Sequence, residues 1–106
     1  MLLKRMTFSA AELNAGTVLA DQIDTTNGKP TAVRVWNYSG ADISFLVMTD
    51  SEYKAFQADE SITDLVPVWE WFFRNIIDLK DGIEWVICQG SGAGHVIGVN
   101  IDITLE

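Results

Sequence analysis

The 106-residue chain has one cysteine, one histidine, two prolines and only seven basic residues. A single cysteine excludes an internal disulfide and a four-cysteine metal site, and a single histidine excludes a two-histidine zinc site. The seven Lys and Arg residues are outnumbered by fifteen Asp and Glu, which gives a net charge of −8. A field of this sign repels phosphate, so we expect no sequence-independent binding to nucleic acid.

Apolar and aromatic residues are abundant. They make up 48% of the chain and include four tryptophans and five phenylalanines, which is too apolar for a disordered segment. The length predicts one domain over residues 1–106, since a second independent core would have no room. The longest apolar runs are short, so we expect no membrane span, and Met6–Ala11 is too short for a signal peptide. We therefore expect folding in a cytoplasm.

The clearest periodic pattern lies at the C-terminus. Between Val96 and Leu105, apolar residues alternate with polar ones, which predicts an antiparallel strand with one wet face. Upstream, Ile83–Cys88 is rich in β-branched and aromatic residues and also predicts a strand, with Ile83, Trp85 and Ile87 on one face. The glycine-rich segment 89–94 between the two strands indicates a hairpin.

A second hairpin is predicted nearer the N-terminus, where strands Ala32–Tyr38 and Asp42–Thr49 flank a turn at 39–41. Both faces of the later strand are largely apolar, so we expect it to be covered on both sides. The turn signal Asn27–Pro30 predicts a strand before it, over 17–24.

A helix is considered for two segments of the chain. Thr49 or Asp50 as an N-cap predicts a short helix near residues 50–57. Val66–Leu79 fits either state, because Pro67 suits a first helical turn while the aromatic and β-branched content favours strands. We favour a strand, a break near 74–75 and a short strand over 76–79, with the helix as the alternative. The whole pattern predicts an all-β chain, a single antiparallel β-sandwich or jelly-roll-like barrel of six to eight short strands.

No motif predicts catalysis, a cofactor or a metal. The segment Gly90–Gly94 lacks the lysine of a phosphate-binding loop and is followed by strand-like alternation, so a flexible turn is favoured. His95 and Ser91 lie four residues apart, which is too far along a strand to form a nucleophile–base pair. Cys88 is expected to be a small buried hydrophobe.

The aromatic block is more informative. Trp69, Trp71 and Phe73 alternate within five residues, and a thin core cannot readily enclose large rings on both faces of a strand. Three explanations remain open for the tryptophans: burial in the core, contact with another copy of the chain, and stacking on a sugar. We expect Trp69, Trp71 and Phe73 to form an interface.

Three segments together carry a family resemblance. They are a strand, an Asn-x-Ser-Gly-Ala turn and a second strand over Val33–Phe45, the segment Leu79–Val86 around Gly82, and the small-residue turn and final strand over Ser91–Leu105. This arrangement resembles the small β-sandwich structural proteins of tailed-bacteriophage virions, of the tail, fibre-attachment or capsid-decoration type. The resemblance is carried by turn types and strand spacing, and it transfers no catalytic residue.

The resemblance implies a non-enzymatic virion structural or assembly protein that assembles in the host cytoplasm and contacts copies of itself and other virion proteins. Residues 1–13 are expected to form an N-terminal arm that docks on a neighbour through Leu2, Leu3 and Phe8. The alternative function is a carbohydrate-binding β-sandwich module for host attachment. A small hydrolase or isomerase on a cupin-like barrel is disfavoured, because cupin metal sites use several histidines and only His95 exists.

Overall fold

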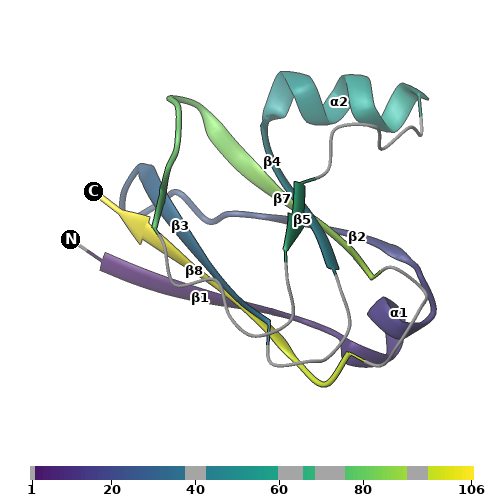
Figure 1. Ribbon diagram of the computed structural model, residues 1–106. Helices are drawn as coiled ribbons and strands as arrows, with labels where there is room; N and C mark the ends of the chain where they lie inside the picture. The colour runs from purple at the N-terminus through teal and green to yellow at the C-terminus, as the bar shows by residue number, and fades with distance from the viewer. Residues whose placement is uncertain (1, 38–42, 60–65, 69–75, 91–95) are drawn as a thin grey trace.

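The computed structural model describes residues 2–37, 43–59, 66–68, 76–90 and 96–106. These residues form two antiparallel sheets packed face to face, which confirms the predicted β-sandwich (Figure 1). The elements in chain order are β1 (Leu2–Phe8), α1 (Ala10–Asn14), β2 (Val18–Gln22), β3 (Pro30–Asn37), β4 (Ile43–Thr49), α2 (Asp50–Asp59), β5 (Val66–Val68), β6 (Ile77–Asp78), β7 (Ile83–Gly90) and β8 (Val99–Leu105).

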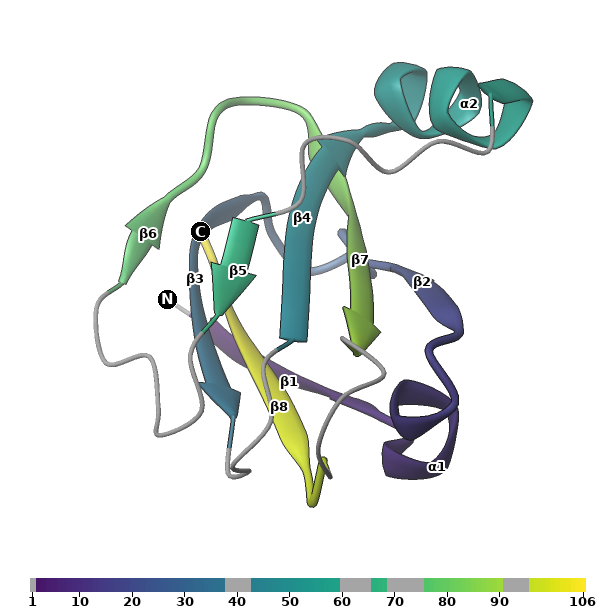
Figure 2. The same ribbon diagram turned by 45° about the vertical axis from the view of Figure 1, so that its right-hand side comes forward.

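Each sheet has four strands and combines strands from the N-terminal and C-terminal halves of the chain. The first, called sheet A, has the order β1-β8-β3-β6, and the second, sheet B, has the order β2-β7-β4-β5. Figure 2 shows β5, β4, β7 and β2 side by side in sheet B, with the short β6 beside β3 in sheet A. The N- and C-termini lie at the same end of the sandwich because β1 and β8 pair antiparallel along their whole length, from Leu2 opposite Leu105 to Phe8 opposite Val99.

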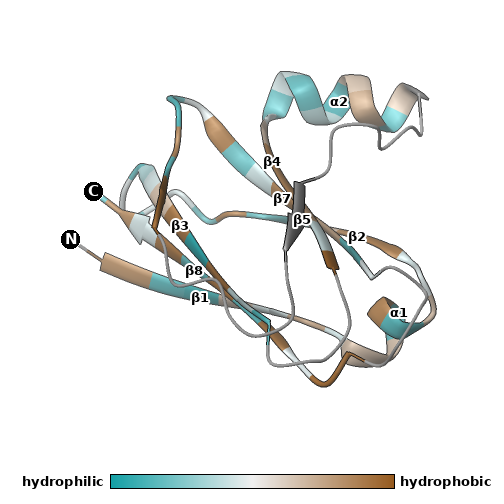
Figure 3. Cartoon of the chain, in the orientation of Figure 1, coloured by the Kyte–Doolittle hydropathy of each residue, from teal (hydrophilic) through white to brown (hydrophobic). Residues whose placement is uncertain are grey.

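The core lies between the sheets and is built by the period-two pattern. In β8, Val99, Ile101, Ile103 and Leu105 are buried and point toward sheet B, while the residues between them point outward. Figure 3 shows the matching alternation of hydrophobic and hydrophilic residues along β3 and β8. Each of these aliphatic side chains stabilises the fold by about 1.5–3 kcal/mol through its burial.

Both predicted hairpins are wrong. Strand β7 pairs with β2 and β4 in sheet B, whereas β8 pairs with β1 and β3 in sheet A. In the same way β3 belongs to sheet A and β4 to sheet B. Each connection therefore crosses from one sheet to the other. The alternation of a strand shows which side faces the core, but both sheets share that core, so the pattern does not select the partner strand.

The last strand starts later than predicted, and one predicted strand face also differs in the structure. The last strand begins at Val99, and Ile97 is 68% exposed, because Asn14 at the end of α1 exchanges two hydrogen bonds with the backbone of Val96 and holds the chain off the sheet.

In β7 the register against β4 shifts between Met48 and Thr49. This bulge turns Ile83 into the core on the same side as Val86, so Ile83 does not share a face with Trp85.

The helix predicted near 50–57 is confirmed as α2, which begins with a capping box. The Thr49 hydroxyl accepts a hydrogen bond from the Glu52 amide at 3.2 Å, and the Glu52 carboxylate accepts one from the Thr49 amide at 2.9 Å. Tyr53 of α2 stacks on Trp85 of β7 with 3.6 Å between ring centroids, which fixes the helix against sheet B. Among the described helices none is long and apolar enough to cross a membrane.

The ambiguous segment 66–79 contains strands where the structure describes it. Val66–Val68 forms β5, which pairs with β4, and Ile77–Asp78 forms β6, which pairs with β3. The favoured strand interpretation is confirmed for these five residues, while residues 69–75 lie outside the described part of the chain. The strand expected over 17–24 is confirmed as β2.

Candidate functional site

The outer face of sheet A, the side away from the core, is the candidate site. Its central row places Arg5 of β1, Asp102 of β8 and Arg34 of β3 directly opposite one another. The row on one side is Thr7, Asn100 and Trp36, and the row on the other side is Leu3, Thr104, Ala32 and Asp78. Both described helices pack against sheet B strands instead, so neither of them covers this face.

Asp102 is the hub of this face. Its two carboxylate oxygens accept hydrogen bonds from Arg5 Nε at 2.7 Å and Arg5 Nη2 at 2.9 Å, and Trp36 Nε1 donates a third at 2.9 Å. The side chains around it leave Asp102 only 7% exposed. The hydrogen bonds from Arg5 lower the pKa of Asp102, with Trp36 acting in the same direction and burial opposing them. Asp102 therefore has a structural role, because its carboxylate binds Arg5 of β1 and Trp36 of β3.

Arg34 is the second arginine beside the same carboxylate. Its guanidinium lies over the Trp36 ring, 5.4 Å from the ring centroid, a distance typical of a cation–π contact. Its Nε is buried and has no hydrogen-bond acceptor among the described residues. Because Arg5 and Trp36 take the oxygens of Asp102, the centre of the face keeps one positive charge in excess of its one carboxylate.

The predicted contact residues fall into three groups. Trp69, Trp71 and Phe73 lie outside the described residues. Leu2 and Leu3 are 46% and 61% exposed on β1, as a contact role requires.

Phe8 belongs to the third group and is removed from the contact residues. It is 7% exposed and packs in the core, because it has the same inward parity as Met6 on β1. The predicted N-terminal arm is also wrong over residues 2–8. These residues pair with β8 through seven consecutive residue pairs and form an edge strand of the sandwich.

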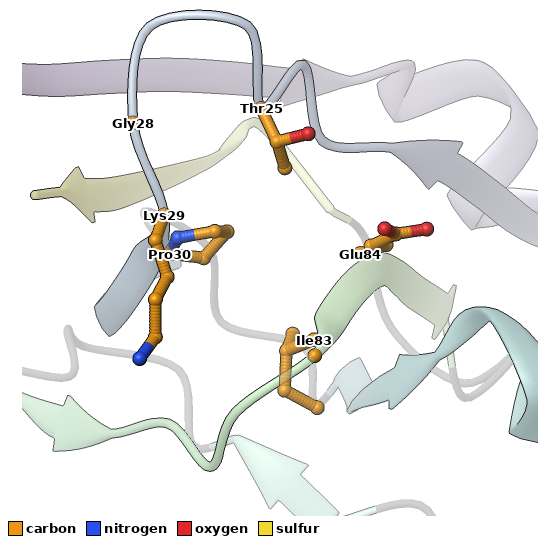
Figure 4. A pocket seen from close by; sticks show the side chains of 7 residues that line it. Thr25, Gly28, Lys29, Pro30, Ile83 and Glu84 are labelled. Carbon is orange, nitrogen blue, oxygen red and sulfur yellow. The ribbon is translucent and has the colours of Figure 1, made fainter.

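A shallow pocket of about 220 Å³ lies at one end of the sandwich, between the β2–β3 connection and the start of β7 (Figure 4). Thr25, Lys29 and Pro30 line one side, and Ile83 and Glu84 line the other. The Lys29 ammonium is already paired with Asp81 at 2.5 Å. Glu84 is the one carboxylate among the residues that line this open pocket, and such a lining does not define a catalytic or cofactor site.

Other reactive groups of the described chain are isolated. Cys88 is fully buried, and this burial raises the pKa of its thiol to about 12, which confirms the expected role as a small core residue. Among the described residues no group of three or more His, Cys, Asp and Glu side chains is placed to hold a metal ion. His95 and Ser91 lie outside the described part.

Comparison with known proteins identifies no relative: no family model, no curated protein and no solved structure matches this chain.

The cluster of Arg5, Arg34, Trp36 and Asp102 was not found from the sequence. The alternation in the last strand does place Asp102 on the outward side. The strand that brings Arg5 beside it lies 97 residues earlier, however, and no local pattern encodes that pairing. Asp102 is the one charged residue of β8, where the other outward residues Asn100 and Thr104 are neutral, and this is the one signal in the sequence that an opposite charge is needed nearby.

Proposed function

We propose that this chain is a non-enzymatic structural or assembly protein of a tailed-phage virion and that it acts through protein–protein contacts, including contacts with copies of itself. The turn and strand pattern over Val33–Phe45, Leu79–Val86 and Ser91–Leu105 supports the virion assignment. The two-sheet sandwich agrees with the fold that this resemblance implies.

The outer face of sheet A carries the contact part of the proposal. It is a face of three aligned strands and a short fourth, and neither described helix covers it. It combines the half-buried Arg34 with the exposed Leu3. Arginine is enriched in protein interfaces, and the exposed leucine adds apolar surface to the same face. Leu2, together with Trp69, Trp71 and Phe73, completes the proposed contact residues.

The experiment is to look for the chain in particles. Virions released by a strain that encodes this chain are purified on a density gradient, and the fractions are analysed by quantitative mass spectrometry. We expect the chain to band with the major capsid and tail proteins at constant stoichiometry across the particle peak. Recovery of the chain only in the soluble fractions, with none in the particle band, contradicts the virion assignment.

The carbohydrate-binding alternative is less well supported. Sugar stacking needs an open aromatic ring, and Trp85 is stacked against Tyr53, while Trp36 has Arg34 over its ring. A sugar platform would therefore have to use Trp69 or Trp71. Titration of tryptophan fluorescence with a panel of soluble oligosaccharides tests this alternative, and a saturable change with one sugar would favour it over the assembly role.

A further inference from the structure

We propose that Asn27 is a modification site, at which the native chain deamidates spontaneously to a mixture of aspartate and isoaspartate. The site is the pair Asn27–Gly28 in the connection between β2 and β3. The change is covalent and adds one negative charge to the net charge of −8. This inference goes beyond the proposed function and does not depend on it, because the reaction needs only the chain and water.

The reaction takes place within this pair of residues. The backbone nitrogen of Gly28 bonds to Cγ of Asn27, the bond from Cγ to Nδ2 breaks, and Nδ2 leaves as ammonia with the proton that the Gly28 nitrogen gives up. The product is a five-membered succinimide ring, which water then opens. Cleavage between Cγ and the Gly28 nitrogen gives aspartate, whereas cleavage between the main-chain carbonyl carbon and that nitrogen gives isoaspartate. No group is oxidised or reduced in either step.

Gly28 leaves its backbone nitrogen open to this reaction. A residue with a Cβ shields its own nitrogen, and glycine does not. Among the described residues, the one group that holds the Gly28 nitrogen is the Thr25 carbonyl, which accepts its hydrogen bond at 3.3 Å and closes a four-residue turn. This distance exceeds the usual range of about 2.7–3.2 Å for such a bond, so the nitrogen is released easily.

The side chain of Asn27 is also accessible. Asn27 is exposed within the turn, and no residue of the described chain forms a hydrogen bond with its amide. Figure 4 shows the chain between Thr25 and Gly28 as an arch at the edge of the shallow pocket. Asn27 can therefore bring its Cγ to the Gly28 nitrogen without leaving a packed position.

The other asparagines of the chain lack this combination. They are Asn14, Asn37, Asn75 and Asn100, and each is followed by a residue that has a side chain. The Asn14 amide exchanges two hydrogen bonds with the Val96 backbone, and Asn37 is fully buried. Asn100 lies within β8, and its side chain accepts a hydrogen bond from Thr7. We therefore expect the reaction to select Asn27.

The pair Asp81–Gly82 could form the same ring from an aspartate. That route needs a protonated carboxyl group, since an ionised carboxylate is a poor electrophile. The hydrogen bond from Lys29 lowers the pKa of Asp81, which keeps this carboxylate ionised near neutral pH. The amide of Asn27 carries no charge and is the more reactive of the two.

The modified chain should keep its fold. Backbone hydrogen bonds fix the chain on both sides of the turn, from Ile23 N to the Glu84 carbonyl at 2.7 Å and from Lys29 N to the Glu106 carbonyl at 2.8 Å. Isoaspartate lengthens the main chain by one atom, and the turn between these two anchors accommodates it. The two sheets then remain as they are, and the circular dichroism spectrum should not change.

Incubation of the full chain in native, mildly alkaline buffer at body temperature tests the inference. Peptide mapping by mass spectrometry should place a mass gain of about 1 Da at Asn27, and an isoaspartate-specific methyltransferase should label the same peptide. A parallel incubation in denaturing urea gives the rate for the unfolded chain. We expect the native rate to lie within about tenfold of it, because only one weak turn hydrogen bond must open. Asn14 and Asn100 are internal controls and should not react in the native chain.

Two variants test the mechanism. Gly28→Ala should slow the conversion by about tenfold or more, because the added Cβ shields the nitrogen that forms the ring. That Cβ would lie 3.0 Å from Cβ of Leu105, so circular dichroism is used to check that this variant is folded. Asn27→Gln provides the second variant, since its longer side chain must close a less favourable six-membered ring, and the acidic form should not accumulate.

A native chain that shows no mass gain at Asn27 while the urea-unfolded chain converts overturns the inference. So does conversion of a folded Gly28→Ala at the wild-type rate, or an acidic form that persists in Asn27→Gln. None of these results bears on recovery of the chain in virions, so the two proposals fail independently.

Discussion

Arg5 and Asp102 stand 97 positions apart in the chain and form a two-pronged ion pair, with Arg5 Nε and Nη2 each bound to a different oxygen of the carboxylate. Because β1 and β8 pair antiparallel, this contact joins the first strand of the sandwich to the last. Trp36 adds a hydrogen bond from β3, so one carboxylate ties together three strands of sheet A.

The first prediction concerns this carboxylate. Asp102→Asn should lower the free energy of unfolding at neutral pH by roughly 1–2 kcal/mol, a moderate cost because Arg5 is itself partly solvated. The pKa of Asp102 is lower in the folded state than its ordinary value of 3.8, so its contribution is present above about pH 4 and is lost as the pH falls through the folded-state pKa. Urea unfolding between pH 7 and pH 2 should therefore show a shallower acid loss of stability in the variant.

Asp81→Asn is the matched control for that experiment. Asp81 also has a lowered pKa, through Lys29, but both side chains of this pair are exposed. Its removal should change stability little at any pH. An acid loss of stability in Asp102→Asn equal to that of the wild type would contradict the role assigned to Asp102.

The second prediction concerns Gly90, where β7 passes under α1. A Cβ at this position would collide with the backbone carbonyl of Leu13, and backbone cannot move aside as a side chain can. Gly90→Ala should therefore destabilise the fold by about 1–3 kcal/mol and speed hydrogen exchange in α1. Gly16→Ala serves as the control, since it has open space and only the strain of a φ of +77°. Gly16 lies outside α1, so this variant should leave hydrogen exchange in α1 near that of the wild type.

The third prediction concerns the Tyr53–Trp85 stack, which fixes α2 on sheet B. Tyr53→Ala should remove about 1 kcal/mol of stability and part of the helical circular dichroism signal, because α2 loses its aromatic contact. Tyr53→Phe keeps the stacked ring and loses only an exposed hydrogen bond from Gln57, so it should behave like the wild type. Equal helix loss in both variants would show that the ring is not what holds α2.

The fourth prediction concerns the thiol of Cys88. Burial raises its pKa from 9.0 to about 12, so at pH 8 the thiolate fraction is roughly 1000-fold lower in the folded state than in the unfolded state. Labelling by a thiol-specific disulfide reagent should be slow in buffer and fast in denaturing urea. Rapid labelling of the native protein at pH 8 would contradict the burial of Cys88 in the core.

Much of the strand content could be predicted, because it depends on local properties. Alternation identified the outward and inward residues of β8, and the β-branched content of 66–68 indicated β5. The start of α2 could be predicted for the same reason, since Thr49, one of the two N-cap candidates, directly precedes the helix and caps it within one turn.

The local sequence pattern did not predict the structure where a residue or strand distant in the sequence determined the local conformation. Ile97 leaves the sheet because Asn14, 82 residues earlier than Val96, takes over the Val96 backbone hydrogen bonds. Ile83 changes face because of a bulge whose position depends on the partner strand β4. Phe8 entered the core because β1 is a full strand of sheet A and not an arm.

The sequence by itself determined that the chain is a β-sandwich with an acidic surface and a buried Cys88, because alternation and composition act over a few residues and need no knowledge of partners. Only the tertiary structure decided that the strands of both predicted hairpins lie in different sheets, and that Arg5, Arg34 and Asp102 share one row. Strand pairing is set by the simultaneous closure of the core and of the backbone hydrogen bonds across the whole chain, and no short segment contains that information.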